Sequence, residues 1–429
     1  MNENTISNKL KGDGIIWMVF FFLCIISIIE VYSASSGLTY KGGYYWGPAL
    51  KHTSFLLIGV CFMVVVMNIK CKYFKIITPF ALLLSFIMLI MVLISGQSTN
   101  DASRWLSLFG IQFQPSELAK GSLILAEAQI LSAMQTKDGA DPRAFKFILS
   151  ISIPIIMLIF FENFSTAFLL GAVVMMMMVI GRVPGKLIGR LVGIVFLAGA
   201  LAVSAVMIFG TDKAKETQNK ANTVLVEHAD NNAKKKEKSA IDKLTHRFDT
   251  WKTRIDKFID NEYVAPNDYD LDNDAQVAHA NIAIVSSNIV GKGPGNSVER
   301  DFLSQAFSDF IYAIVIEEMG ILGAFVVCML YIILLFRTAI IANRCANTFP
   351  ALLIMGFALL LVTQAMFNMA VAVGLAPVTG QPLPLISKGG TSTIMNCVYI
   401  GIILSVSYSA KKNDSTESSS PATVKAKTA

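Results

Sequence analysis

The chain has 429 residues, of which 54% are hydrophobic and 15% are charged, and its mean hydropathy is +0.57. Soluble globular domains usually contain about 25% charged residues, so this composition excludes an ordinary soluble domain and indicates an integral membrane protein. The net charge of +6 requires no nucleic-acid partner, because the basic residues gather in short loops between apolar segments.

Ten apolar segments are candidates to cross a bilayer, which takes about 20 mainly apolar residues per helix. Lipid offers no hydrogen-bond partners to backbone groups, so each segment is predicted to be helical. The segments are residues 15–34, 50–69, 74–95, 113–133, 147–161, 164–180, 188–210, 309–336, 348–374 and 390–409. The fifth and sixth are short and require close protein neighbours at their ends. The predicted fold is therefore an all-α integral membrane protein, with about ten transmembrane helices between residues 15 and 410.

Lys and Arg are distributed unevenly between the short loops, and loops rich in these residues remain in the cytoplasm. The richer set of loops contains Lys9, Lys11, Lys70, Lys72, Lys75, Lys137, Arg143, Lys146, Arg182, Lys186, Arg190, Arg337, Arg344, Lys411 and Lys412. The opposite set contains only Lys41, Lys51, Arg104 and Lys388. We therefore expect the N-terminal tail, residues 1–14, and a disordered C-terminal tail, residues 411–429, to be cytoplasmic.

One connection, residues 211–307, is much longer than the others and faces outward in this orientation. Apolar residues recur every three or four positions from Ile241 to Phe258, which predicts a helix on the outer membrane face or a hairpin that only caps the bundle. A second helix is predicted from Gln276 to Ile289. The turn GKGPGNS (291–297) that follows lacks the strand and the Lys-Ser/Thr ending of a phosphate-binding loop.

The segment SDFIYAIVIEEMG (308–320) places three carboxylates in or beside an apolar run. A charge at the bilayer centre costs at least about 2.5 kcal/mol, so such acids need partners or a water-filled cavity. Asp309 lies at the predicted outer boundary, where it is either an acid favoured by a helix start or a functional carboxylate. For Glu317 and Glu318 we favour a structural role, in which at least one meets a cation or polar cluster.

A second polar segment is SRWLSLFGIQFQPSELAK (103–120). Arg104 and Trp105 lie at the outer boundary, where Trp anchors the interface and Arg can face anionic groups. Glu117 and Lys120 are three residues apart, a spacing that permits an ion pair on one helix face. The alternative is that Lys120 and Arg104 bind an anionic group of a substrate.

A third segment, NMAVAVGLAPVTGQPLPLISKGGTS (368–392), is too rich in Pro and Gly to form a regular helix. Irregular backbone at membrane depth is tolerated only where protein or water covers it. We therefore expect a re-entrant or tightly packed outer loop carrying the cation Lys388, or else a rigid connection without chemistry. The three polar segments predict one outward cavity, but physical reasoning alone does not choose an enzyme over a transporter.

Together these segments resemble three signatures of the SEDS family, the membrane proteins of shape, elongation, division and sporulation. The family's signatures RW…QPSELAK, LPEAHTDFIFAVIGEELG and P-T-G-LP-ISYGGSS match SRWL…FQPSELAK, FLSQAFSDFIYAIVIEEMG and PVTGQPLPLISKGGTS. The matches occur in the family's order and cover nearly the whole region of spans. Departures are Phe307 and Ser308 for the family's His and Thr, Lys388 for its Tyr, and Asn163 for an Asp.

The resemblance implies a peptidoglycan glycosyltransferase that polymerises lipid II by inverting transfer, with undecaprenyl pyrophosphate as the leaving group. Asp309 falls on the family's catalytic aspartate, the general base. The substrate-binding residues implied are Arg104, Trp105, Glu117, Lys120, Ser308, Ser387 and Lys388. A divalent cation, Mg²⁺ or Mn²⁺, is the optional cofactor.

The resemblance also implies partners and a location. The expected partners are lipid II, the nascent glycan strand, a class B penicillin-binding protein with transpeptidase activity, and other single-span division proteins. The expected location is the bacterial cytoplasmic (inner) membrane at the division septum, because the chain resembles the division branch, FtsW, more than the RodA-like elongation branch. Alternatives that the residues leave open are a lipid II flippase and a non-catalytic scaffold that recruits the transpeptidase.

Overall fold

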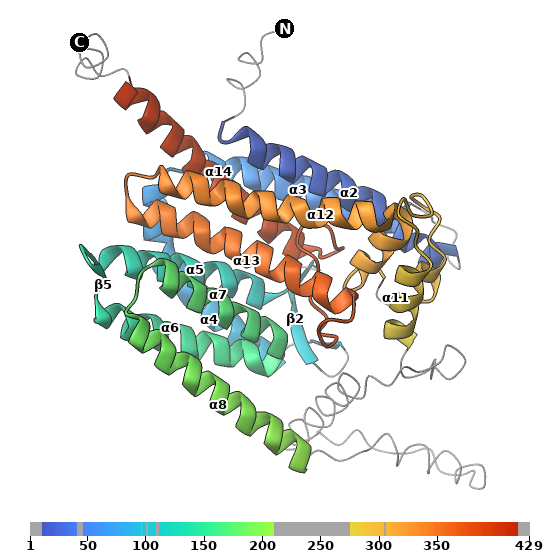
Figure 1. Ribbon diagram of the computed structural model, residues 1–429, viewed down its shortest axis with the longest axis horizontal. Helices are drawn as coiled ribbons and strands as arrows, with labels where there is room; N and C mark the ends of the chain where they lie inside the picture. The colour runs from blue at the N-terminus through green and yellow to red at the C-terminus, as the bar shows by residue number, and fades with distance from the viewer. Residues whose placement is uncertain are drawn as a thin grey trace. The chain divides into compact units, whose positions relative to one another are not determined.

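The structure is a computed structural model that describes residues 11–40, 46–95, 97–99, 102–108, 111–209, 275–303 and 306–418 (Figure 1). The chain forms two compact units. The larger unit consists of residues 1–188, 270–375 and 379–429, and it contains every candidate site residue. The smaller unit consists of residues 189–269 and 376–378.

Each of the ten predicted segments coincides with a helix. These helices are α2 (Gly14–Tyr40), α3 (Gly47–Met67), α4 (Cys71–Ser95), α5 (Pro115–Ala133), α6 (Pro142–Glu162), α7 (Phe164–Ile180), α8 (Gly185–Phe209), α12 (Ile311–Asn343), α13 (Thr348–Ala372) and α14 (Thr391–Ser418). Among the described residues, seven helices are long and apolar enough to cross a membrane. The mainly helical fold is thus confirmed, whereas the count of ten crossings stays a prediction.

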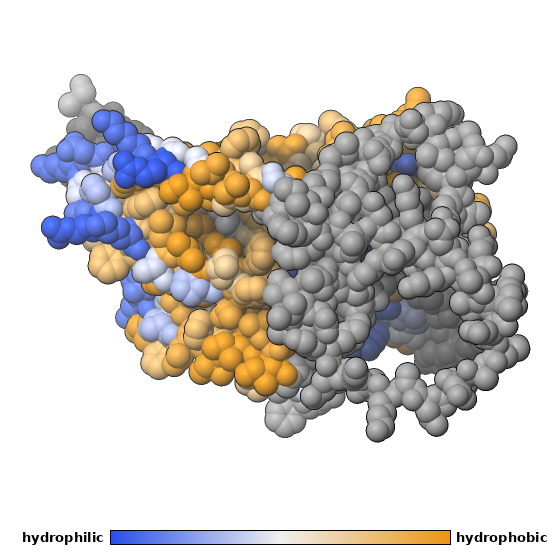
Figure 2. All heavy atoms as spheres, turned by 90° about the horizontal axis from the view of Figure 1, so that it is seen from below, coloured by the Kyte–Doolittle hydropathy of each residue, from blue (hydrophilic) through white to orange (hydrophobic). Residues whose placement is uncertain are grey.

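Helix α13 lies in the interior of the larger unit, between α12 on one side and α5 and α7 on the other (Figure 1). The apolar stretches of α13 and α14 are 72% buried, whereas those of α3, α4 and α6 are 28% buried. The outer helices expose large apolar side chains such as Leu57 and Phe80, as expected for surfaces that face lipid. Figure 2 shows an extensive hydrophobic surface and hydrophilic residues gathered at one end.

Two small sheets were not predicted. β1 (Gln97–Thr99), β2 (Ala102–Leu108) and β3 (Ile111–Phe113) form an antiparallel sheet in that order, between α4 and α5. β4 (Gln135–Thr136) and β5 (Gly139–Ala140) form a hairpin between α5 and α6. The all-α prediction omitted them because it weighed only helix-length apolar runs. The alternation Leu-Ser-Leu in β2 and Ile-Gln-Phe in β3 is the strand signal that it passed over.

The ends of several segments differ from the prediction. Helix α11 (Ala275–Val285) is shorter than the predicted Gln276 to Ile289, and a 3₁₀ turn, η2 (Glu299–Asp301), follows it. Helix α14 continues to Ser418, so regular structure extends beyond the predicted start of the tail at 411. The predicted amphipathic helix from Ile241 to Phe258 and residues 419–429 lie outside the described residues.

Candidate functional site

Asp309 lies in the turn that immediately precedes α12 and is half-buried. Helix α12 begins at Ile311, its N-cap is Phe310, and that N-cap residue makes no side-chain cap hydrogen bond. Asp309 thus directly precedes the N-cap, and both alternatives for it, an acid favoured by the helix start and a functional carboxylate, stay predictions. The Ser308 hydroxyl donates a hydrogen bond to Asp309 Oδ1 over 2.9 Å, so these two predicted site residues are in direct contact.

The backbone around Asp309 is held by the third polar segment. The consecutive carbonyl oxygens of Phe307, Ser308 and Asp309 each accept a hydrogen bond. Their donors are, in order, the Lys388 backbone N–H at 2.9 Å, the Ser387 hydroxyl at 2.6 Å and the Asn368 side-chain amide at 2.8 Å. Three bonds on three successive residues fix the path of the chain that carries the Asp309 carboxylate.

Buried amides support the irregular backbone from Thr379 to Gly390. Asn368 also donates to the Gln381 carbonyl over 2.6 Å, and the Gln381 amide donates to the Thr166 hydroxyl over 2.7 Å. Gln364 donates to the Pro382 carbonyl over 3.0 Å. Protein groups thus satisfy backbone carbonyls that lipid cannot. The expectation of a tightly packed loop is confirmed for the part that belongs to the larger unit.

Glu117 and Lys120 form the ion pair that their spacing permits, with 2.9 Å between Lys120 Nζ and Glu117 Oε1. Lys120 is 1% exposed, and its Nζ also donates to Gln364 Oε1 over 3.0 Å. The Tyr399 hydroxyl donates to the Glu117 carbonyl over 2.5 Å. The ion-pair alternative is therefore confirmed, and binding of a substrate anion by Lys120 would require this pair to open.

Lys388 is the cation of the third segment and is half-buried. Its Nζ lies 4.6 Å from the centre of the Phe307 ring, a cation–π contact. Burial, reinforced by the positive charge of Lys51, holds the pKa of Lys388 below its usual value. The side chain thus places a partly desolvated ammonium group beside the segment that carries Asp309.

The predicted residues Arg104 and Trp105 lie on strand β2. Trp105 is partly exposed and pairs with Gln97 of β1, whereas the side chain of Arg104 lies outside the described part of the chain. The Thr391 hydroxyl donates to the carbonyl of Gln112 in β3 over 3.3 Å. This bond brings the sheet next to the start of α14, at the end of the third segment.

Two polar groups of this network were not predicted as site residues. Gln364 of α13 bonds to the second and third segments, and Gln381 connects the third segment to α7; both are buried. Asn163, where the family has an Asp, caps α7 by accepting the N–H groups of Ser165 and Thr166. The available signal was a pair of amides, Gln364 and Asn368, four residues apart in an otherwise apolar helix.

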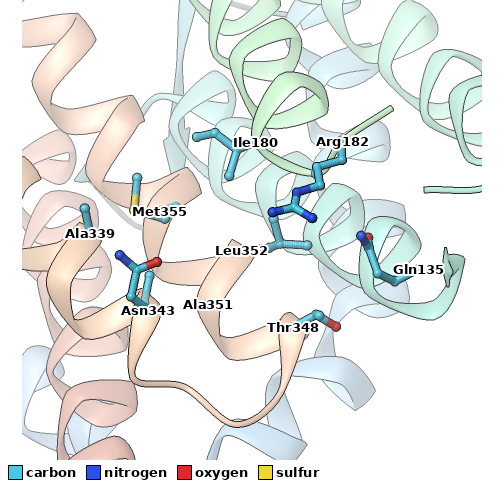
Figure 3. Close-up of a pocket in the computed structure, with 11 residues that line it drawn as sticks. Gln135, Ile180, Arg182, Ala339, Asn343, Thr348, Ala351, Leu352 and Met355 are labelled. Carbon is cyan, nitrogen blue, oxygen red and sulfur yellow. The ribbon is translucent and has the colours of Figure 1, made fainter. Parts of the chain in front are cut away.

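The structure also contains a pocket of about 380 Å³ at the other ends of these helices (Figure 3). Arg182 and Gln135 line it from the ends of α7 and α5, and Asn343 and Thr348 line it from α12 and α13. These residues adjoin the Lys/Arg-rich loops, and none is a predicted site residue. The pocket is therefore separate from the candidate site, which lies before the N-terminal end of α12.

Metal-binding groups were sought among the described residues. They contain no group of three or more His, Cys, Asp or Glu side chains that could hold a metal ion. The groups that hold the backbone around Asp309 are an amide, a hydroxyl and a backbone N–H, which are poor partners for Mg²⁺ compared with carboxylates. A divalent cation at this site therefore stays a prediction.

Comparisons with known proteins agree with one another. The family model of FtsW, RodA and SpoVE cell cycle proteins matches residues 13–236 and 239–412. The probable peptidoglycan glycosyltransferase FtsW of Halomonas elongata is 28% identical over 402 residues, 92% of this chain and 90% of that protein. The peptidoglycan glycosyltransferase MrdB of Escherichia coli K12 is 25% identical over 407 residues, 94% of this chain and 96% of that protein.

A solved structure has the same fold. One chain of a peptidoglycan synthase complex, which coordinates polymerization and crosslinking, superposes with a TM-score of 0.65. The superposition covers 94% of this chain and 99% of that chain, at 21% sequence identity. At this identity the likeness speaks for the fold alone.

Proposed function

Because the chain belongs to the FtsW, RodA and SpoVE family of cell cycle proteins, we propose that it is a peptidoglycan glycosyltransferase that polymerises lipid II. The seven long apolar helices in the described part of the chain, together with the family, make it a multi-pass membrane protein. Relatives that match over nine-tenths of the chain are named peptidoglycan glycosyltransferases. The observation that carries the proposal is the convergence of the segments around Asp309 and Lys388 on one side of the bundle.

In the proposed reaction, Asp309 is the general base. A sugar 4-hydroxyl is a poor nucleophile and needs a base within hydrogen-bond reach. The carboxylate accepts the hydroxyl proton as the oxygen forms a bond to the anomeric carbon of the muramic sugar. The bond from that carbon to undecaprenyl pyrophosphate breaks, the pyrophosphate leaves with the electron pair, and the α linkage becomes β. Ser308 supports this role by donating to Asp309 Oδ1.

The leaving pyrophosphate gathers negative charge, which a fixed cation stabilises. We assign this role first to Lys388, because its backbone N–H bonds to the Phe307 carbonyl, two residues before Asp309. Arg104 and Trp105 are proposed to contact the same substrate from β2. Lys120 would join only if it left Glu117. The mechanism relies on no divalent cation, and the Mg²⁺ or Mn²⁺ expectation stays a prediction.

We further propose a class B penicillin-binding protein as partner and the division septum of the inner membrane as location. The FtsW-named relative supports the division branch over the elongation branch. The fold shared with a chain of a synthase complex that also crosslinks supports a transpeptidase partner. We expect this partner to raise the rate of polymerisation, which is measured with and without a purified class B protein. An equal rate in both cases would contradict the proposed partnership.

The proposed activity is tested with purified Asp309→Asn protein, the transpeptidase partner and labelled lipid II. We expect no glycan ladder on a gel, with normal membrane insertion and partner binding, because an amide cannot accept the proton. Asp301→Asn is the matched control, since Asp301 is exposed and close in the chain. Full-length ladders from Asp309→Asn would remove Asp309 as the base. Transfer of labelled lipid across a liposome bilayer without chain formation would favour a flippase.

A further inference from the structure

Helix α12 is broken near its outer end. Gly320 has φ 70° and ψ −175°, a conformation outside the helical region that side chains rarely adopt. The break separates residues 311–319, which directly follow Asp309, from residues 321–343. The short outer part therefore does not take its position from the long part through a continuous hydrogen-bond ladder.

A glycine-rich turn, Gly291–Arg300, fills this break. The backbone N–H groups of Lys292 and Gly293 donate to the carbonyls of Glu317 and Glu318 over 2.9 and 2.8 Å. The N–H of Leu322, beyond the break, donates to the Ile289 carbonyl over 3.2 Å. A Cβ on Gly291 would come closer than 3 Å to the backbone of Glu318 and Gly320, and a Cβ on Gly320 equally close to that of Ile289 and Gly291. The turn therefore supplies the hydrogen bonds that the helix has lost.

The turn also encloses the carboxylates of Glu317 and Glu318, which are both 0% exposed. Glu317 accepts from Lys292 Nζ at 2.6 Å, the Ser297 hydroxyl at 2.5 Å and the Val298 N–H at 3.1 Å. Glu318 accepts from the Gly295 N–H at 2.9 Å, the Ser297 N–H at 3.3 Å and the hydroxyl of Ser33 in α2. Arg300 Nη1 lies 3.9 Å from Glu318 and donates to Ser33 over 2.9 Å. The expectation that at least one of these glutamates meets a cation or polar cluster is thus confirmed.

The outer part of α12 is consequently a short rod held at two ends. Hydrogen bonds from Asn368, Ser387 and Lys388 hold the end that carries Asp309. The glycine-rich turn holds the other end, two helical turns away. Burying two carboxylates is costly. Because a continuous apolar helix would span the membrane without them, Glu317 and Glu318 are not needed for crossing the membrane itself.

We propose that Lys292, Glu317 and Glu318 are positioning residues for Asp309: they fix the outer part of α12 so that the carboxylate meets the substrate hydroxyl. This inference rests on the proposed glycosyltransferase function. Because a misplacement of about 1 Å costs on the order of 100-fold in rate, loosening the far end of the rod slows catalysis. Substrate binding is unaffected, because none of the three residues belongs to the proposed binding set.

The test compares two matched pairs of full-length variants. Lys292→Met removes the ion pair between the partly exposed Lys292 and the buried Glu317, and Lys292→Arg keeps a cation of similar reach. Glu317→Gln removes a buried carboxylate, and Asp138→Asn removes an exposed one in the β4–β5 hairpin. Initial rates are measured as a function of lipid II concentration, in the presence of the transpeptidase partner, to give kcat and KM. The temperature is kept well below the thermal unfolding midpoint of every variant. Hydrogen–deuterium exchange of residues 306–319 and 321–343 gives a readout that does not depend on activity.

We expect Lys292→Met and Glu317→Gln to lower kcat by roughly 10- to 100-fold with KM unchanged, and to speed exchange in 306–319 but not in 321–343. Lys292→Arg restores most of kcat, and Asp138→Asn changes neither measurement. Unchanged kcat in folded Lys292→Met protein, or exchange that rises equally in both segments, overturns the proposal. If the wild-type protein makes no glycan, the proposed function is contradicted rather than the positioning role. In that case the hydrogen–deuterium exchange pattern alone tests whether the glycine-rich turn holds the outer part of α12.

Discussion

Lys120 shows at the residue scale why a charged side chain can occupy the bundle interior. Its ammonium group is 1% exposed but has two oxygen partners, Glu117 and Gln364. Removing one member of a buried ion pair leaves the other charge uncompensated, which costs about 3 to 5 kcal/mol, whereas replacing both members is often close to neutral. Comparing the single with the double substitution therefore shows whether Lys120 is a structural charge or a substrate-binding one.

We expect Lys120→Met to lower the free energy of unfolding by about 3 to 5 kcal/mol, and Lys120→Met with Glu117→Gln to recover most of that loss. Thermal unfolding in detergent and binding of labelled lipid II measure the two effects, with exposed Lys137→Met as control. A stable double variant that still binds lipid II makes the pair structural. A stable double variant that has lost binding supports the substrate contact predicted for Lys120.

The candidate site was predictable at this scale only where its chemistry is local. Asp309 stands out as an acid at the edge of an apolar run, and the i,i+3 spacing of Glu117 and Lys120 permits their pair. Gln364 is the third member of that cluster, and it lies 244 residues beyond Lys120 in the chain. No local pattern reports a contact across that separation, so the amide network around Asp309 emerged only from the fold.

At the scale of elements, the helices followed from hydrophobic length alone, but the break in α12 did not. The run from Phe310 to Asn343 reads as continuous, and an isolated Gly is tolerated in a helical pattern. What breaks the helix is the approach of residues 289–293, which supply backbone partners at Gly320. The three-stranded sheet was missed for a related reason, since strands of three to seven residues stabilise one another only in pairs.

Gly320 and Gly171 are expected to respond in opposite ways to substitution by Ala. Gly320→Ala places a Cβ closer than 3 Å to the backbone of Ile289 and Gly291 and at positive φ. We therefore expect a loss of at least about 2 kcal/mol in unfolding free energy, or failure to fold. Gly171→Ala meets nothing within 4 Å in helix α7 and should be neutral or stabilising by up to about 1 kcal/mol. Thermal midpoints of the two purified variants check this contrast, and equal midpoints would contradict it.

At the scale of the whole molecule, Asp13 ties the first helix to two of the last three. Its carboxylate accepts from Arg337 Nη2 over 2.7 Å and from Nε over 3.0 Å, and its N–H donates to Ser407 over 3.0 Å. Burial acts to raise the pKa of Asp13, but hydrogen bonds and charge from Arg337, with the N–H groups of Ile16 and Ile15, outweigh it. The pKa of Asp13 is therefore lowered overall, and its charged form stabilises the fold.

Asp13→Asn should lower the free energy of unfolding by about 1 to 3 kcal/mol at neutral pH, because it removes hydrogen bonds to a charged group. With the folded pKa below the unfolded value, this stabilisation is fully present above the unfolded pKa and is lost as pH falls through the folded one. The difference between wild type and variant should stay constant from about pH 7 to 5 and shrink below about pH 4. Exposed Asp138→Asn is the control, and a difference that grows on acidification would contradict the linkage.

The orientation of the bundle decides whether Asp309 can act as proposed, because the glycan strand is made outside the cytoplasmic membrane. The excess of Lys and Arg in one set of loops predicts that residues such as Asp138 lie in the cytoplasm and that the glycine-rich turn lies outside. Val298, in that turn, is 54% exposed, and Asp138 is exposed in the β4–β5 hairpin. Both positions therefore accept a thiol label without disturbing the core.

We expect Val298→Cys, in a background without the six native cysteines, to react with a membrane-impermeant thiol reagent on intact spheroplasts. Asp138→Cys should react only after the membrane is permeabilised. Because Val298 binds Glu317 through its N–H, and Glu317 lies two helical turns from Asp309, the label reports the side on which the proposed base stands. The reverse pattern would place Asp309 at the cytoplasmic face, away from the glycan strand, and polymerisation by this carboxylate would have to be abandoned.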